Sequence, residues 1–133
     1  MSEANVEIVK RGYEQFMATG RFVAEISTPD FVWDMSNFDG WPEQQVYEGI
    51  AEAEAFIRDW SAAWDDWQLD VESYHHVGDK VVALVRQQGR SKAAGMPVDM
   101  SLAQVWTFRD GKQVRMDMYS DRREALRSVG LGE

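Results

Sequence analysis

Apolar residues recur at helical spacing in the first half of the chain and at alternate positions in the second half. The helical pattern begins in residues 3–19, which are predicted to form an amphipathic helix that ends before Gly20. The apolar face of this helix consists of Val6, Val9, Tyr13 and Phe16. A short second helix is predicted to end at Thr28-Pro29, because the residue before a proline disfavours the helical conformation. Its apolar residues are Phe22, Val23 and Ile26.

Residues 31–35, FVWDM, are predicted to form a strand, and residues 36–49 a long connection rich in Gly, Pro, Asn and Asp. A third helix is predicted to follow, because apolar residues at steps of three and four form one continuous stripe. The stripe consists of Ile50, Ala53, Ile57, Trp60, Trp64 and Trp67.

Four strands are then predicted, at residues 69–76, 80–90, 97–109 and 112–120. Short glycine-containing turns separate them, which indicates an antiparallel meander. A short last helix is predicted to begin at Asp121, with Glu124 as its capping partner, and to end near Gly130. Helices that precede a run of antiparallel strands indicate an α+β domain, in which a strongly curved sheet leaves a hollow beneath the helices.

Composition and charge narrow the function classes. The length of 133 residues predicts one domain, residues 1–133, and a net charge of -9 argues against nucleic acid and anionic membranes as partners. The chain contains no cysteine, which excludes disulfides and thiolate chemistry. No signal peptide or long apolar run is present, so a cytoplasmic protein without membrane segments is expected.

Gln104 is the most informative polar residue. On the predicted strand it shares a face with Val98, Met100, Leu102, Trp106 and Phe108. A buried amide without a partner costs about 1–3 kcal/mol, so this side chain must bond to a neighbour, a water or a ligand. A structural amide and a ligand contact are both consistent with this pattern.

Three further side chains are candidates. Gln87 ends a face that is otherwise apolar, and it lies either in a cavity or at its mouth. Tyr13 is either a core tyrosine bonded to backbone or water, or a donor to a ligand carbonyl. Asp34 follows Trp33, and an aspartate among aromatic rings can serve as a general acid or base. Strand alternation places Trp33 and Asp34 on opposite faces, and the apolar Trp33 is expected to point inward.

No cofactor motif is found. His75 and His76 stand next to a turn, and without cysteine a zinc site would have to recruit distant carboxylates, so no metal site is predicted. The chain also contains no glycine-rich phosphate loop, GxSxG or HExxH motif. A chemistry that needs no cofactor is therefore expected.

The GYEQF helix, the tryptophan-rich segment, the strand AQVWTFRDGK and the tail YSDRREALRSVGL together resemble the SnoaL-like branch of the nuclear transport factor 2-like superfamily. The resemblance covers nearly the whole chain. It implies a cone-shaped curved antiparallel sheet that encloses a cavity together with N-terminal helices, and a homodimer formed through the outer sheet face. This fold hosts ketosteroid isomerases, cyclases, epoxide hydrolases and pure binding modules.

The resemblance also implies site positions. Tyr13 matches the tyrosine of ketosteroid isomerases, Gln104 falls where they carry a buried acid, and their base falls near Asp34. Met118 falls where related epoxide hydrolases carry a catalytic aspartate, so Val114, Met116 and Met118 are expected to face the cavity. Asp117 is then expected to point outward with Arg115 and Tyr119, whereas a shift of one residue would turn it inward.

Two functions follow. One is a binding protein whose cavity holds a hydrophobic small molecule. The other is an isomerase, cyclase or hydrolase in which Tyr13 and Gln104 polarise an oxygen and Asp34 moves a proton. A filled core without a cavity is a third possibility. The predicted pocket residues are Trp33, Phe56, Trp60, Trp64, Val85, Gln87, Met100, Trp106, Met116 and Met118.

Overall fold

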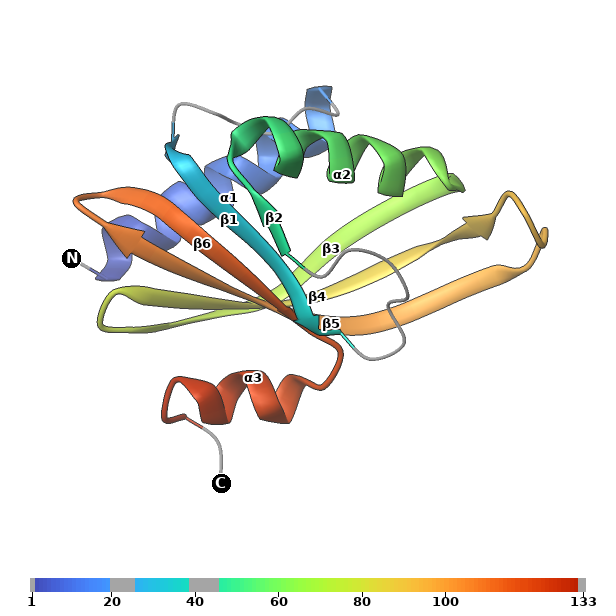
Figure 1. Cartoon of the computed structure of the whole chain (residues 1–133). Coiled ribbons are helices and arrows are strands. Elements are labelled where there is room, and N and C mark those ends of the chain that lie inside the picture. The colour runs from blue at the N-terminus through green and yellow to red at the C-terminus, as the bar shows by residue number, and fades with distance from the viewer. Residues whose placement is uncertain (1, 20–25, 39–45, 132–133) are drawn as a thin grey trace.

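The computed structural model describes residues 2–19, 26–38 and 46–131 (Figure 1). The helices and strands are α1 (Ser2–Thr19), β1 (Ser27–Asn37), β2 (Val46–Glu48), α2 (Ile50–Ala62), β3 (Trp64–Val77), β4 (Lys80–Ser91), β5 (Pro97–Arg109), β6 (Lys112–Tyr119) and α3 (Arg122–Ser128). The strands form a six-stranded sheet in the order β2-β1-β6-β5-β4-β3. The first helix and the four-stranded antiparallel meander are confirmed.

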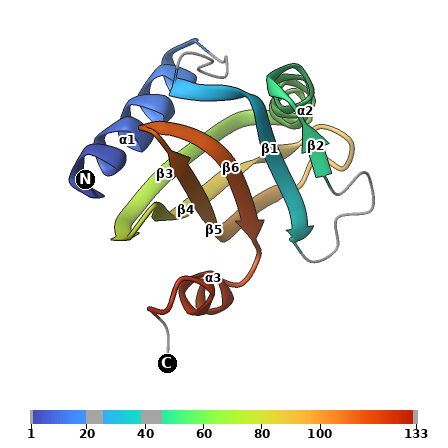
Figure 2. The ribbon, with the colours of Figure 1, turned by 60° about the vertical axis from the view of Figure 1, so that its left-hand side comes forward.

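The sheet is strongly curved, and α1 and α2 cover its concave side while α3 lies on the convex side (Figures 1 and 2). All strand pairs are antiparallel except β1 and β6. β1 lies next to β6, the last strand of the meander, and runs parallel to it. The α+β class and the cone-shaped sheet are therefore confirmed, with one parallel pair in the otherwise antiparallel arrangement.

The predicted ends of two helices lie in strands instead. Thr28 and Pro29 lie in β1 rather than at a helix end. Pro29 has no backbone N–H, and the β1–β2 pairing does not require one there because it begins only at Val32. Phe22 and Val23 lie outside the described residues. The third helix ends at Ala62, so its last two predicted members are strand residues.

Trp64 and Trp67 belong to β3, and their helical spacing comes from an irregularity in that strand. Asp66 has a φ of 54°, and the register with β4 shifts between Asp65 and Gln68. An inserted residue changes which face the following side chains occupy, so Trp67 reaches the concave side. The spacing of three and four between apolar residues thus continues from α2 into β3, although only the first part is helical.

Hydrophobic cores lie on both faces of the sheet. The larger one is on the concave side and contains buried residues of β1, β5 and β6, such as Phe31, Trp106 and Met116. A smaller one, with Val82, Val105 and Ala125, lies under α3. Asp121 caps α3 by accepting a hydrogen bond from the backbone N–H of Arg123 at 2.8 Å.

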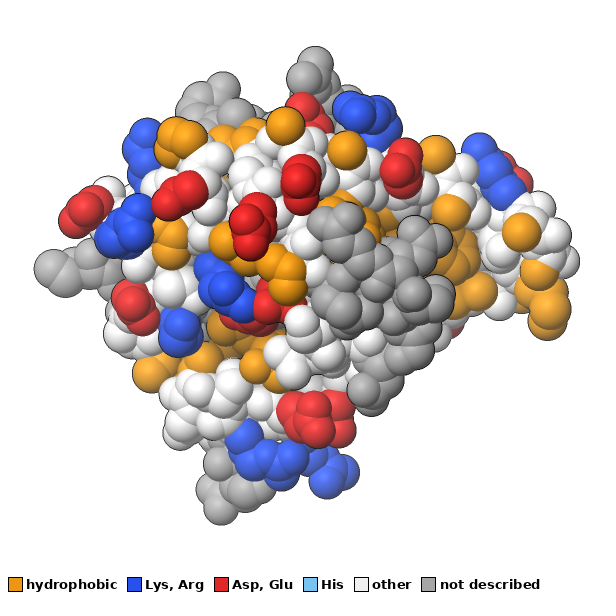
Figure 3. All heavy atoms as spheres, in the orientation of Figure 1, with side chains coloured by type: hydrophobic (Ala, Val, Ile, Leu, Met, Phe, Trp, Pro, Cys, Tyr) orange, Lys and Arg blue, Asp and Glu red, His pale blue; other side chains and the backbone are white. Residues whose placement is uncertain are grey.

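The β6 side chains point as predicted, except for Val114. Met116 and Met118 are buried in the concave core, and Asp117 lies on the convex side with Arg115. Val114 does not join the inward set, because the β5–β6 register shifts there and Gln113 stands opposite Phe108. Figure 3 shows acidic and basic side chains interspersed on one face of the molecule rather than gathered in one patch.

Candidate functional site

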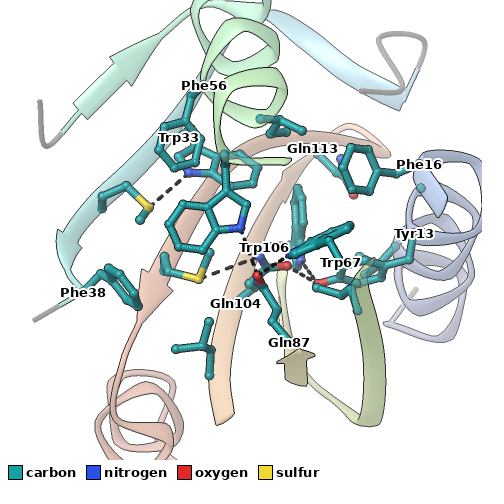
Figure 4. A pocket seen from close by; sticks show the side chains of 18 of the residues that line it. Tyr13, Phe16, Trp33, Phe38, Phe56, Trp67, Gln87, Gln104, Trp106 and Gln113 are labelled. Atoms are coloured by element: carbon teal, nitrogen blue, oxygen red, sulfur yellow. Dashed lines mark hydrogen bonds between the residues drawn. The ribbon is translucent and has the colours of Figure 1, made fainter. Parts of the chain in front are cut away.

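A cavity lies between the concave side of the sheet and the two helices that cover it (Figure 4). Its wall is mainly aromatic, with rings from five elements: Phe16, Trp33, Phe56, Trp60, Trp67 and Trp106. Three buried glutamines, Gln87, Gln104 and Gln113, and the hydroxyl of Tyr13 supply polar groups. None of the described lining residues is an aspartate, glutamate, histidine, lysine or arginine.

The cavity volume is about 70 Å³. Pockets for drug-sized ligands measure roughly 300–1,000 Å³, so a compact molecule fits this space better than a polycyclic one. Met35 and Met118 form part of the wall, and methionine side chains adapt their shape readily. The concave core is thus hollow at one place, contrary to the possibility of a completely filled core.

Tyr13 connects α1 to β5 at the wall of the cavity. Its hydroxyl donates a hydrogen bond to Oε1 of Gln104 and accepts one from Nε1 of Trp106 at 3.0 Å. Burial raises the pKa of the Tyr13 phenol far above its ordinary value, and the hydrogen bond from Trp106 offsets only part of this effect. Tyr13 therefore stays protonated at neutral pH, where it can donate a hydrogen bond but cannot act as a base.

Gln104 is buried and stands at the centre of this network. Its oxygen is occupied by Tyr13, and its Nε2 approaches the thioether sulfur of Met118 at 3.7 Å. Thioethers are weak acceptors, so the amide nitrogen keeps most of its capacity to donate. The structure thus gives Gln104 a structural partner and leaves a donor for a ligand, and its role in ligand binding stays a prediction.

Gln87 lies in the cavity wall rather than at a solvent-exposed strand end, with 3% of its surface exposed. Its Oε1 accepts hydrogen bonds from Nε1 of Trp60 at 3.0 Å and Nε1 of Trp67 at 3.2 Å. Trp67 comes from the irregular part of β3, so this contact depends on the shifted register of that strand.

Gln113 is a cavity residue that the sequence pattern did not reveal. Its Nε2 donates to Oγ of Ser27 at 3.1 Å, which joins the start of β1 to β6. Alternation counted back from Met116 and Met118 selects Val114 for the inward face, but the register shifts between Thr107 and Phe108 and places Gln113 there instead. The signal that could have found it is the two-residue turn of Asp110 and Gly111, which both have positive φ. This turn places Arg109 opposite Lys112 and therefore Gln113 opposite Phe108.

Asp34 does not meet Tyr13 and Gln104. It points to the convex side, where its carboxylate forms an ion pair with Nη2 of Arg115 and accepts a hydrogen bond from the backbone N–H of Ser36 at 2.7 Å. Trp33 takes the inward position, as the strand alternation predicts. The general-base role of Asp34 therefore has no geometric support in this structure.

Four other predicted pocket residues do not line the cavity. Val85 and Met116 are fully buried in the surrounding core, and Met100 packs against that core from a half-buried position. Trp64 lies at the junction of α2 and β3 with its ring 5.7 Å from that of Trp60. Gln87 and the other five predicted residues do line the cavity: Trp33, Phe56, Trp60, Trp106 and Met118.

Within the described ranges, no three His, Asp or Glu side chains are grouped so that they could hold a metal ion. No helix among these residues is long and apolar enough to cross a membrane.

Comparison with protein families identifies the domain. The model of the SnoaL-like domain matches residues 10–116, which is most of the chain. The chain belongs to the SnoaL-like domain family. The comparison with curated proteins found no match.

Solved structures resemble this SnoaL-like protein along nearly its full length. An NTF2-like protein of unknown function from Burkholderia pseudomallei shares 23% identity, with a TM-score of 0.75 and coverage of 98% of this chain and 99% of that one. A candidate SnoaL-like polyketide cyclase from Jannaschia sp. CCS1 also shares 23% identity at a TM-score of 0.75, covering 99% and 95%. TerC co-crystallized with polyporic acid shares 22% identity at a TM-score of 0.73, covering 95% and 97%. At these identities the likeness establishes the fold.

Proposed function

We propose that this SnoaL-like protein binds an uncharged, mainly aromatic small molecule in the cavity of its curved sheet. The observation that carries this proposal is the composition of the described wall, which combines aromatic rings and methionines with neutral amides. Burial of a charged ligand without a counter-charge is strongly unfavourable, whereas apolar surface gains roughly 25 cal/mol for each Å² removed from water. A neutral ligand with a few polar atoms matches this wall.

Catalysis by proton transfer is less well supported. It needs a group that accepts a proton at neutral pH, and the one ionisable side chain of the described wall is Tyr13, whose pKa is raised by burial. Asp34 is held by Arg115 on the other side of the sheet. The relation to a candidate polyketide cyclase nevertheless makes an isomerase or cyclase the second candidate, with Tyr13 and Gln104 polarising a carbonyl oxygen.

A matched pair of compact probes tests the binding proposal. Methyl benzoate and benzoate share a ring and differ mainly in charge, and binding of each is followed by protein-observed NMR. We expect methyl benzoate to shift the indole N–H signals of Trp60, Trp67 and Trp106 and benzoate to leave them unchanged. Equal binding of benzoate, or no binding of either probe, would contradict the proposal.

Variants place the binding in the cavity. Gln104→Leu is expected to weaken methyl benzoate binding, because it removes the amide beside Met118 and the acceptor for Tyr13. Gln88→Leu is the matched control, since Gln88 is the neighbour of Gln87 on β4 and points to the opposite face. A loss of binding in the control alone would place the probe outside the cavity.

Deuterium exchange distinguishes an enzyme from a binding protein. Acetophenone in D₂O loses its methyl signal in the proton spectrum as a base removes the protons next to the carbonyl. We expect the same rate with and without the protein. A faster rate with wild-type protein that falls to the buffer rate in Tyr13→Phe would instead favour the isomerase or cyclase.

A further inference from the structure

The amide oxygen of Gln87 is held by two tryptophans from different elements. Nε1 of Trp60 in α2 and Nε1 of Trp67 in β3 both donate to it, at 3.0 and 3.2 Å. Figure 4 labels Gln87 and Trp67. A carbonyl oxygen has two lone pairs, so these two donors use its full acceptor capacity. The helix that covers the cavity and the edge strand of the sheet thus meet at one side-chain atom.

This arrangement determines the orientation of the Gln87 amide. The oxygen and nitrogen of a glutamine are distinguished by their hydrogen-bond partners, and an indole N–H can only donate. If the amide were turned over, its NH₂ group would face two N–H donors. The oxygen therefore points to the tryptophans, and the NH₂ group points away from them.

The NH₂ group of Gln87 is left without an acceptor. Gln87 is 3% exposed, it lines the cavity, and its hydrogen bonds in the structure are the two that its oxygen accepts. Most side-chain donors inside proteins bond to a protein atom, a water or a ligand. The cavity is the space from which an acceptor can reach this nitrogen.

Gln87 is separate from the Tyr13–Gln104 pair. On the β4–β5 ladder Gln87 stands opposite Met100, and Gln104 stands opposite Ala83. The two backbone positions are four residues apart along the strands, which corresponds to about 13 Å at 3.3 Å per residue. The two amides also have different hydrogen-bond partners, so substitution of Gln87 leaves the bond between Tyr13 and Gln104 in place.

We propose that Gln87 is a specificity-determining residue of this cavity and selects neutral aromatic ligands that carry an acceptor oxygen, such as a ketone, ester or ether. This inference rests on the proposed function, because it assumes that a small molecule occupies the cavity. The Gln87 NH₂ group donates to the ligand oxygen, while Trp60 and Trp67 hold the amide in the donating orientation.

Two nearly isosteric probes test the proposal on the wild-type protein. Acetophenone has an acceptor oxygen where α-methylstyrene has a CH₂ group. An apolar cavity without a donor favours the alkene, because the ketone loses hydrogen bonds to water when it enters. We expect the ketone to bind about fivefold more tightly, equivalent to about 1 kcal/mol at 1.4 kcal/mol for each factor of ten.

The readout is the side-chain NH₂ signal of Gln87 in nitrogen–proton spectra, assigned by its disappearance in Gln87→Met. We expect this signal to shift with acetophenone and to stay in place with α-methylstyrene. Gln87→Met keeps the length of the side chain and removes the donor, so it is expected to abolish the preference for the ketone. Gln88→Met on the opposite face is the matched control and is expected to keep that preference.

The outcomes separate this inference from the proposed function. If both probes bind equally and the Gln87 signal does not move, the cavity binds ligands and the inference about Gln87 is wrong. The same conclusion follows if Gln87→Met keeps the preference for the ketone. If neither probe binds, both the proposed function and the inference are refuted.

Discussion

Arg115 joins two carboxylates on the convex side of the sheet. Its Nη2 contacts Asp34 on β1, and its Nε donates to both oxygens of Asp117 at 3.0 and 3.1 Å. The side chains of Asp34 and Asp117 are 10% and 17% exposed, whereas that of Arg115 is 41% exposed. The two carboxylates are neighbours in the parallel β1–β6 register, so both interact with Arg115, and Lys80 is a further cation near Asp117.

Replacement of Arg115 by methionine removes this cation and keeps most of the apolar stem. Removal of one partner of a fully buried ion pair costs roughly 3–5 kcal/mol, because a charge is left without compensation. Water reaches the half-exposed Arg115 site and screens part of this cost, so we expect Arg115→Met to lower the free energy of unfolding by about 2 kcal/mol. The melting temperature is expected to fall by roughly 8 °C.

Urea unfolding at pH 7 measures this change, and the chain contains a matched control. Arg86 makes a two-point contact with Asp99 at 2.9 and 2.5 Å, but both side chains are nearly half exposed. Exposed pairs contribute about 0–1 kcal/mol. Arg86→Met is therefore expected to change stability by less than half as much as Arg115→Met.

The stability cost of Arg115→Met is also expected to depend on pH, in a direction set by Asp117. Burial raises the pKa of Asp117, while Arg115 lowers it by a smaller amount. A carboxyl group with a raised pKa in the folded state contributes stability at low pH that is lost as the pH rises through its range. Removal of Arg115 strengthens this effect, so the cost of Arg115→Met is expected to shrink between pH 7 and pH 4.

Two results together would refute this account of Arg115. If Arg115→Met costs no more than Arg86→Met and the cost does not change with pH, Asp34 is not held beside Arg115. Such a result would remove the argument that keeps Asp34 out of the cavity. The acid–base role predicted for Asp34 from its aromatic surroundings would then need to be considered again.

Two other predictions concern Tyr13 and Asp121. The raised pKa of Tyr13 means that folded wild-type protein keeps this proton above pH 10 while the unfolded chain loses it, so stability is expected to fall by up to about 1.4 kcal/mol per pH unit from that point. Tyr13→Phe should show a smaller decline in urea unfolding between pH 9 and pH 11, and parallel curves would contradict the burial of Tyr13. Asp121→Ala removes the cap of α3 and is expected to cost about 1 kcal/mol by the same assay, whereas an unchanged value would mean that the hydrogen bond to Arg123 contributes nothing to stability.

The sequence alone determined the elements whose period is regular. Alternation over β4 and β5 follows directly from one buried face per strand, so Gln104 could be assigned to the concave side in advance. On β6 alternation alone left two choices, and the family resemblance selected Met116 and Met118 for the inward face. The first helix and the Asp121 cap were predictable for the same reason, because neighbouring residues along the chain decide them.

The tertiary structure decided the features that depend on irregular strands and distant partners. The left-handed Asp66 and the shift after Thr107 reverse the local alternation, and they bring Trp67 and Gln113 to the cavity wall. Pairing between strands, rather than local periodicity, sets these registers.

Partner choice is another property of the tertiary structure. Asp34 faces away from the cavity because β1 pairs with β6 and places it beside Arg115. The oxygen of Gln87 is occupied because a helix and an edge strand each place an indole N–H beside it. A sequence shows that a buried amide or carboxylate must have partners, and only the folded chain determines which partners can reach it.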